Sequence, residues 1–165
     1  MKLKQIVSAA ALLAAGLWVL SLIPFSSTIR QEIPANIYTD GAVTSTTTVT
    51  IDGKRTNYIV RENSYFGEFS LPEVPRTERE GVNVSIRWND AKTNTQFLIY
   101  HTAGTSISLI PGRIAISEDM TRFACYLADG TVLATSDEAY KNYTAHVTYG
   151  SETRFTAIDG AVPAI

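Results

Sequence analysis

The sequence predicts a mainly β protein: an extracytoplasmic antiparallel β-sandwich, or partly open barrel, of about ten strands with one C-terminal helix, preceded by a single N-terminal transmembrane helix. Three observations lead to this prediction: an uncharged apolar run near the N-terminus, repeated alternation of apolar and polar residues, and frequent Asp-Gly pairs. The chain has 165 residues, 45% of them hydrophobic, which suits one globular domain.

The N-terminal segment has the features of a signal-anchor. Lys2 and Lys4 precede an apolar run over residues 6–25, which as a helix is about 30 Å long, close to the thickness of the hydrocarbon core of a bilayer. Positive charge on the short leading side keeps residues 1–5 in the cytoplasm and directs the rest of the chain across the cell membrane. We therefore expect a single-pass membrane protein with its C-terminal domain outside.

A tether is expected between the anchor and the domain. Residues 26–35 are polar and proline-bounded, so they predict a short linker before an extracytoplasmic β-rich domain over residues 36–165. A cleaved signal peptide is the alternative interpretation of the N-terminal segment. Retention is favoured because the stretch Leu22–Ser27 places large residues where a signal peptidase requires small ones.

Alternation of apolar and polar residues predicts the strands of this domain. It is cleanest in residues 82–88, where four apolar side chains point to one side. The apolar stretch Phe97–Tyr100 predicts a strand covered on both faces. The predicted strands cover residues 43–51, 56–61, 65–71, 82–88, 95–102, 106–110, 113–116, 122–128, 131–135 and 152–158.

Turn and cap signals divide these segments. Both residues of an Asp-Gly pair tolerate the positive φ angles of tight hairpin turns. Four such pairs predict turns, at residues 40–41, 52–53, 129–130 and 159–160. The sequence Thr135–Glu138 has the form of a capping box, so a helix is predicted to begin there and to end near Gly150.

One stretch resembles a known family. From Val49 to Pro72, an Asp-Gly turn signal followed by a Gly-x-Phe motif at residues 67–69 is similar to the hairpin pattern of transthyretin-like, carboxypeptidase-regulatory-like β-sandwich modules. The resemblance covers under a fifth of the chain. It implies a sandwich fold and transfers no functional residue.

Charge and cysteine content exclude several functions. A net charge of −2, with Lys and Arg scattered along the chain, excludes electrostatic binding to nucleic acid. With one cysteine and two histidines the chain has no internal disulfide, and we expect neither a metal site nor another cofactor. Gly-x-Ser-x-Gly and Ser-x-x-Lys, the motifs of two large hydrolase classes, do not occur.

Cys125 supports one enzymatic hypothesis. Together with His101 and Arg154 it supplies the residue types of a sortase-like transpeptidase, which joins proteins to the cell wall through a thioacyl intermediate. The context Thr121–Cys125 departs from the Thr-Leu-x-Thr-Cys pattern of that family. The simpler interpretation places Cys125 in the core as an inert thiol with a raised pKa.

The favoured function is therefore non-catalytic binding of an envelope protein or glycan. Tyr58, Tyr100 and Tyr126 are the candidate binding residues, because some of them are expected on an exposed face, where a tyrosine stacks on sugar rings or on the side chains of a partner. His101 is expected to be hydrogen-bonded at the end of a core strand rather than to act as a general base.

Overall fold

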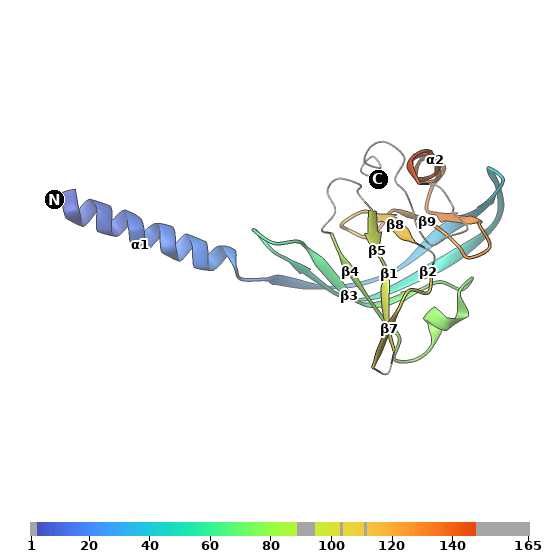
Figure 1. Cartoon of the computed structure of the whole chain (residues 1–165), viewed down its shortest axis with the longest axis horizontal. Coiled ribbons are helices and arrows are strands. Elements are labelled where there is room, and N and C mark those ends of the chain that lie inside the picture. Colours follow the sequence, from blue (N-terminus) through green and yellow to red (C-terminus); the bar gives the residue numbers. More distant parts are fainter. Residues whose placement is uncertain (1–2, 89–94, 103, 111, 148–165) are drawn as a thin grey trace.

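In the computed structural model, ten antiparallel strands form one sheet that curls into a half-barrel (Figure 1). The structure describes residues 3–88, 95–102, 104–110 and 112–147. Along the sheet the strands follow the order β5-β8-β9-β10-β1-β2-β3-β4-β6-β7. The bounds are α1 (Leu3–Ser21), β1 (Phe25–Thr39), β2 (Ala42–Asn57), β3 (Ser64–Ser70), the 3-10 helix η1 (Pro75–Glu78), β4 (Asn83–Arg87), β5 (Thr95–Phe97), β6 (Ile99–Thr102), β7 (Thr105–Ile107), β8 (Arg113–Ile116), β9 (Phe123–Tyr126), β10 (Val132–Ala134) and α2 (Asp137–His146).

This architecture confirms the mainly β prediction, the antiparallel strands and the helix that follows them. All ten strands belong to one curled sheet, so the structure matches the predicted alternative, the partly open barrel, and not the two-layered sandwich. The cause lies in residues 95–102, which were predicted as a single strand. A break at Leu98 divides them, so that β5 pairs with β8 while β6 pairs with β4. Consecutive strands thereby lie in opposite halves of the strand order, which curls the sheet around a single core.

The hairpin of β1 and β2 is the longest pairing in the sheet. Its register runs from Phe25 opposite Asn57 to Thr39 opposite Ala42. The segment predicted as a tether, residues 26–35, is therefore the first part of β1. It joins the sheet because its alternate side chains are apolar: Ile33 and Ala35 are buried in the core. At this end, the strand begins within a few residues of α1.

The Asp-Gly pairs take two different roles. Asp40 and Gly41 close the β1–β2 hairpin with positive φ angles of 50° and 85°, as predicted, and residues 129–130 form the turn between β9 and β10. The pair at residues 52–53 is not a turn, because it lies inside β2, where Gly53 is directly opposite Gly67 of β3. The pair at residues 159–160 and the strand predicted over residues 152–158 lie outside the described residues.

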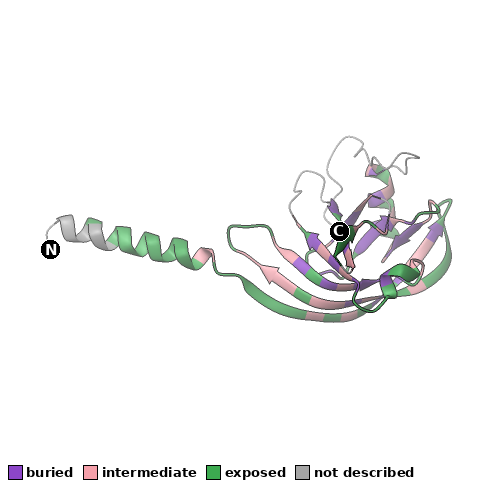
Figure 2. Ribbon diagram, turned by 60° about the horizontal axis from the view of Figure 1, so that its bottom comes forward, coloured by how far each residue is buried: buried purple, intermediate pink, exposed green. Residues whose placement is uncertain are grey.

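The concave side of the sheet holds the main core (Figure 2). The side chains of β4 that were predicted to point inward do so: Val84 and Ile86 are fully buried, and the half-buried Trp88 packs against them with its indole N–H donating to the carbonyl of Ile116 at 3.1 Å. Residues 58–61, predicted to be part of a strand, instead lie in the β2–β3 loop, because β2 ends at Asn57.

Helix α2 covers the other side of β9 and β10. The predicted helix is confirmed, but its N-terminus is capped one residue later than the box at Thr135–Glu138 predicts: the Ser136 hydroxyl accepts from the backbone N–H of Ala139 at 3.1 Å. Ala139 and Tyr143 are buried in a second apolar cluster between the helix and the sheet. The helix ends at His146, before Gly150.

Helix α1 projects from one end of the sheet (Figure 1). Its large apolar side chains from Leu12 to Leu20 are more than half exposed. Over the residues that the structure describes, we find no helix long and apolar enough to cross a membrane.

We predict that Gly53→Ala destabilises the domain. A Cβ atom at this position meets the Phe66 carbonyl oxygen and the Tyr65 hydroxyl, each at 2.6 Å, and the Cα of Gly67 at 2.7 Å. Overpacking of this kind typically lowers the free energy of unfolding by about 1–3 kcal/mol. Urea denaturation of the whole chain measures the change.

The matched control is Gly16→Ala in α1, where an added Cβ has no neighbour within 4 Å. This variant is expected to unfold at the wild-type urea concentration. If Gly53→Ala did the same, the close approach of β2 and β3 at this point would be refuted.

Candidate functional site

Cys125 lies on the concave side of β9 and is completely buried. Burial raises the pKa of the thiol to about 12, and the nearby Glu73 carboxylate acts in the same direction. The thiolate, which is the reactive form of cysteine, is therefore disfavoured near neutral pH. This arrangement matches the inert core cysteine rather than a nucleophile.

His101 lies on the opposite side of the sheet. Its neighbour Tyr100 points into the core and is fully buried, so the alternation of side chains along β6 directs His101 outward. The imidazole Nε2 is 2.9 Å from the Ser85 hydroxyl on β4, and Nδ1 is 3.0 Å from the Ser106 hydroxyl on β7. The structure thus does not bring His101 and Cys125 together, and Arg154 lies outside the described residues.

The three candidate tyrosines do not share a surface. Tyr100 is in the core, where its hydroxyl donates to the Phe69 carbonyl at 3.0 Å, so it is not one of the tyrosines on an exposed face. Tyr126 is half-buried, with its hydroxyl donating to the Val147 carbonyl at 3.2 Å. Tyr58 is half-buried at the start of the β2–β3 loop. Tyrosine stacking therefore does not define a binding site here.

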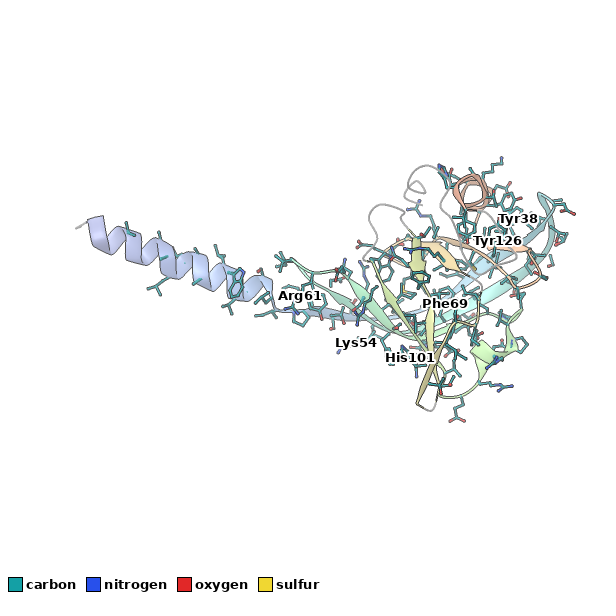
Figure 3. The ribbon with its side chains drawn as sticks, in the orientation of Figure 1. Tyr38, Lys54, Arg61, Phe69, His101 and Tyr126 are labelled. Carbon is teal, nitrogen blue, oxygen red and sulfur yellow. The ribbon has the colours of Figure 1, made fainter. Side chains whose placement is uncertain are left out.

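A different surface has the composition of a binding site. On the convex side of the sheet, Phe66 and Phe97 are each 53% exposed and Ile99 is 42% exposed. Phe66 pairs across the strands with Ser85, and Ser85 pairs in turn with Ile99, so these residues form one row over β3, β4 and β6. We call this surface the outer patch; its members are Phe66, Ser85, Arg87, Phe97, Ile99 and His101 (His101 is labelled in Figure 3).

The outer patch is hollowed by a groove of about 470 Å³. It is lined by Ser85, Arg87, Phe97, Ile99, His101 and Ser106. The lining combines apolar side chains with two hydroxyls, an imidazole and a guanidinium group, which gives both apolar area and directional hydrogen-bonding groups. Such a mixture is suited to binding a ligand rather than to packing against another part of the domain.

Two contacts hold the groove side chains in place. The hydroxyls of Ser85 and Ser106 engage both nitrogens of His101, which fixes the plane of the imidazole. At the other end, the guanidinium carbon of Arg113 lies 4.4 Å from the centre of the Phe97 ring, and Arg113 also donates to the Thr95 hydroxyl at 2.7 Å. The exposed ring is therefore backed by a cation that is itself hydrogen-bonded.

Sequence reasoning missed the outer patch because Phe97–Tyr100 was expected to be covered on both sides. Only Leu98 and Tyr100 are buried. One signal was available in β4, the strand that pairs with β6. Its residues 83, 85 and 87 are polar, which indicates that this side of the sheet faces solvent. A neighbour of β4 then exposes its own outward residues as well.

Among the described residues, no group of three or more His, Cys, Asp or Glu side chains is placed to hold a metal ion. Comparison of the chain with protein-family models, with curated protein sequences and with solved structures found no match. The function must therefore be argued from the site alone.

We predict that Cys125 resists thiol reagents in the folded protein. Its side chain is fully buried and its pKa is about 12, so a disulfide reagent at neutral pH is expected to react only after the chain is denatured. Val43→Cys, at an exposed position near the end of β2, is the control and should react at once. Prompt reaction of the wild-type thiol would revive the cysteine-enzyme hypothesis.

We also predict that Cys125 makes the domain less stable at alkaline pH. The thiol has a pKa of 9.0 in open solution and about 12 in the fold, so the unfolded chain loses this proton first. Stability from this group is complete below pH 9 and is lost as the pH rises from there toward 12. Burial raises the pKa values of Tyr100 and Tyr143 as well, so part of the alkaline loss is independent of Cys125.

The measurement compares wild type with Cys125→Ala by urea denaturation at neutral pH and at about pH 10. The variant is expected to lose less free energy of unfolding between the two pH values, whatever its stability at neutral pH. Equal losses in the two proteins would show that the thiol ionises as readily in the fold as in the unfolded chain.

Proposed function

We propose that this protein is a single-pass, membrane-anchored binding protein, whose exported domain holds an envelope protein or glycan on the outer patch without catalysis. The observation that carries the proposal is the exposure of Phe66, Phe97 and Ile99 beside a groove with fixed hydrogen-bonding groups. A cluster of large apolar side chains on the convex side of a sheet is costly to leave in water, and it is commonly retained where a partner covers it.

The residues around this cluster support binding. Aromatic side chains and arginine are enriched in protein interfaces, and the outer patch has two phenylalanines, Arg87 and the neighbouring Arg113. Hydroxyls on β4 and β7 supply donors and acceptors at the edge. This composition favours a protein partner, while a sugar ring lying on Phe97 with hydroxyls toward the serines is the alternative.

Two features support a non-catalytic role. The chain's one thiol is buried on the far side of the sheet from His101. Ser85 lies within hydrogen-bond distance of an imidazole, yet a serine nucleophile also needs backbone N–H groups free to stabilise an oxyanion. Ser85 is in β4, which is paired with β3 on one side and β6 on the other, so the N–H groups around it serve the sheet.

The N-terminal segment supports membrane attachment. The domain lies beyond the C-terminal end of α1 and does not cover the exposed apolar side chains of the helix (Figure 1). Lys2 and Lys4 precede the apolar run, and the positive-inside rule places them in the cytoplasm. Although α1, over its described residues, is not by itself long and apolar enough to cross a membrane, the apolar run continues beyond it to Phe25. We propose that residues 6–25 together enter the cell membrane and that the β-rich domain lies outside.

We predict that Phe66→Ser combined with Ile99→Thr lowers binding at least tenfold, because a partner that covers both side chains loses the burial of two large apolar groups, each contributing about 1.5–3 kcal/mol. The probes are the detergent-solubilised envelope proteins of the source cell and, separately, its purified envelope polysaccharide. Each is passed over the immobilised full-length chain, and the retained material is quantified.

The control is Val43→Thr, which removes an exposed apolar side chain near the start of β2, outside the outer patch. It should bind as the wild type does, and all variants should show the same urea midpoint. Retention on wild type and on the double variant to the same extent would refute the outer patch as the binding surface; retention of polysaccharide alone would identify a glycan as the partner.

A further inference from the structure

The register of the β1–β2 hairpin brings a distant loop to the end of α1. Phe25, four residues beyond the end of α1, lies opposite Asn57, the last residue of β2. Residues 58–63 then form the β2–β3 loop. About three residues of that loop extend past the last pair before the chain returns, which at the rise of a strand is roughly 10 Å. The tip of the loop therefore reaches the level of the C-terminal end of α1.

The figures agree with this geometry. Figures 1 and 2 show the β2–β3 loop at the end of the sheet nearest α1, and Arg61 of the loop is labelled beside that junction in Figure 3. The Asp40-Gly41 turn lies at the opposite end of the same hairpin.

The tip of this loop is apolar and uncovered. Ile59 is 65% exposed and Val60 is 58% exposed. On the adjoining segment after α1, Ile23 and Phe25 are also exposed. Four large apolar side chains are thus gathered at the end of the domain that meets the C-terminal end of α1, whereas the turn at the far end consists of an aspartate and a glycine.

We infer that the β2–β3 loop is a second membrane contact, which inserts Ile59 and Val60 at the boundary between lipid headgroups and acyl chains. The inference rests on the proposed anchoring of α1, because a helix that enters the bilayer places this loop at the lipid surface. Arg61 lies next to the inserted residues, at the depth of the lipid phosphates. Isolated apolar residues at an interface add membrane affinity in proportion to the area that they bury.

The loop has a consequence for binding. A single helix leaves the domain free to tilt and to rotate about the helix axis. A second contact on the neighbouring hairpin restrains the tilt, so the outer patch keeps a constant height and a constant angle to the bilayer.

The test uses the full chain reconstituted in phosphatidylcholine vesicles. Val60→Cys carries an environment-sensitive fluorophore, and Val43→Cys, an exposed valine near the opposite end of β2 from this loop, is the matched control. Cys125 is buried and stays unlabelled under native conditions, which labelling of the wild-type chain verifies. The readouts are the emission maximum and quenching by spin-labelled lipids in the same vesicles.

We expect a blue-shifted emission and several-fold stronger quenching for the label at residue 60 than for the label at residue 43. Flotation of the unlabelled wild-type chain with the vesicles tests the anchor separately. A chain that does not float refutes the anchoring and, with it, this inference. A chain that floats while both labels remain in water refutes the loop contact and leaves the anchoring intact.

Shielding of the label at residue 60 without quenching by the spin-labelled lipids would identify a second copy of the chain, rather than lipid, as the occupant, and would also overturn the inference. Because labelling itself adds apolar area, Ile59→Ser combined with Val60→Ser is examined without a label at that site. With the fluorophore at residue 43 in this variant, energy transfer to acceptor lipids is expected to report a broader range of heights above the bilayer than in the wild-type loop.

Discussion

The register of the β1–β2 hairpin is the constraint on which the rest of the structure depends. One turn, Asp40-Gly41, sets the pairing of fifteen residues of β1 with their partners on β2. The sheet extends from both sides of this hairpin. On one side β10 pairs with the C-terminal part of β1, and on the other side β3 pairs with the C-terminal part of β2. A slip by one residue would exchange the buried and exposed faces of both strands. The register of this hairpin therefore determines which residues form the core, which lie on the outward face of the sheet, and where the loop near α1 is placed.

The division of residues 95–102 at Leu98 determines where the sheet is open to solvent. Because β5 and β6 join opposite halves of the strand order, the segment passes from one half to the other with Leu98 and Tyr100 buried and with Phe97 and Ile99 outside. The same division that closes the core thus produces the outer patch. An apolar surface of this kind arises from topology and would not be seen in any one strand alone.

Local patterns predicted the strands well where one face was polar, as in residues 82–88, and predicted the helix from its capping box. They failed where the same sequence pattern occurs in two different structural contexts. Residues 40–41 and 52–53 are the same dipeptide, yet only the first is a turn, because Gly53 faces Gly67 on a strand that no local rule pairs with it. The apolar stretch Phe97–Tyr100 likewise does not indicate which face of the strand is exposed to solvent. Which faces are covered depends on long-range pairing, and the candidate site depended on the same information.

The short passage from α1 into β1 has a mechanical consequence. If α1 is anchored in a membrane as proposed, a pull on the domain is transmitted to that anchor through β1, without a slack linker to absorb it. The force then runs along the strand rather than across it, so the ladder between β1 and β2 is loaded in shear and many hydrogen bonds share the load. A joint of this type resists tension far better than one that opens a bond at a time.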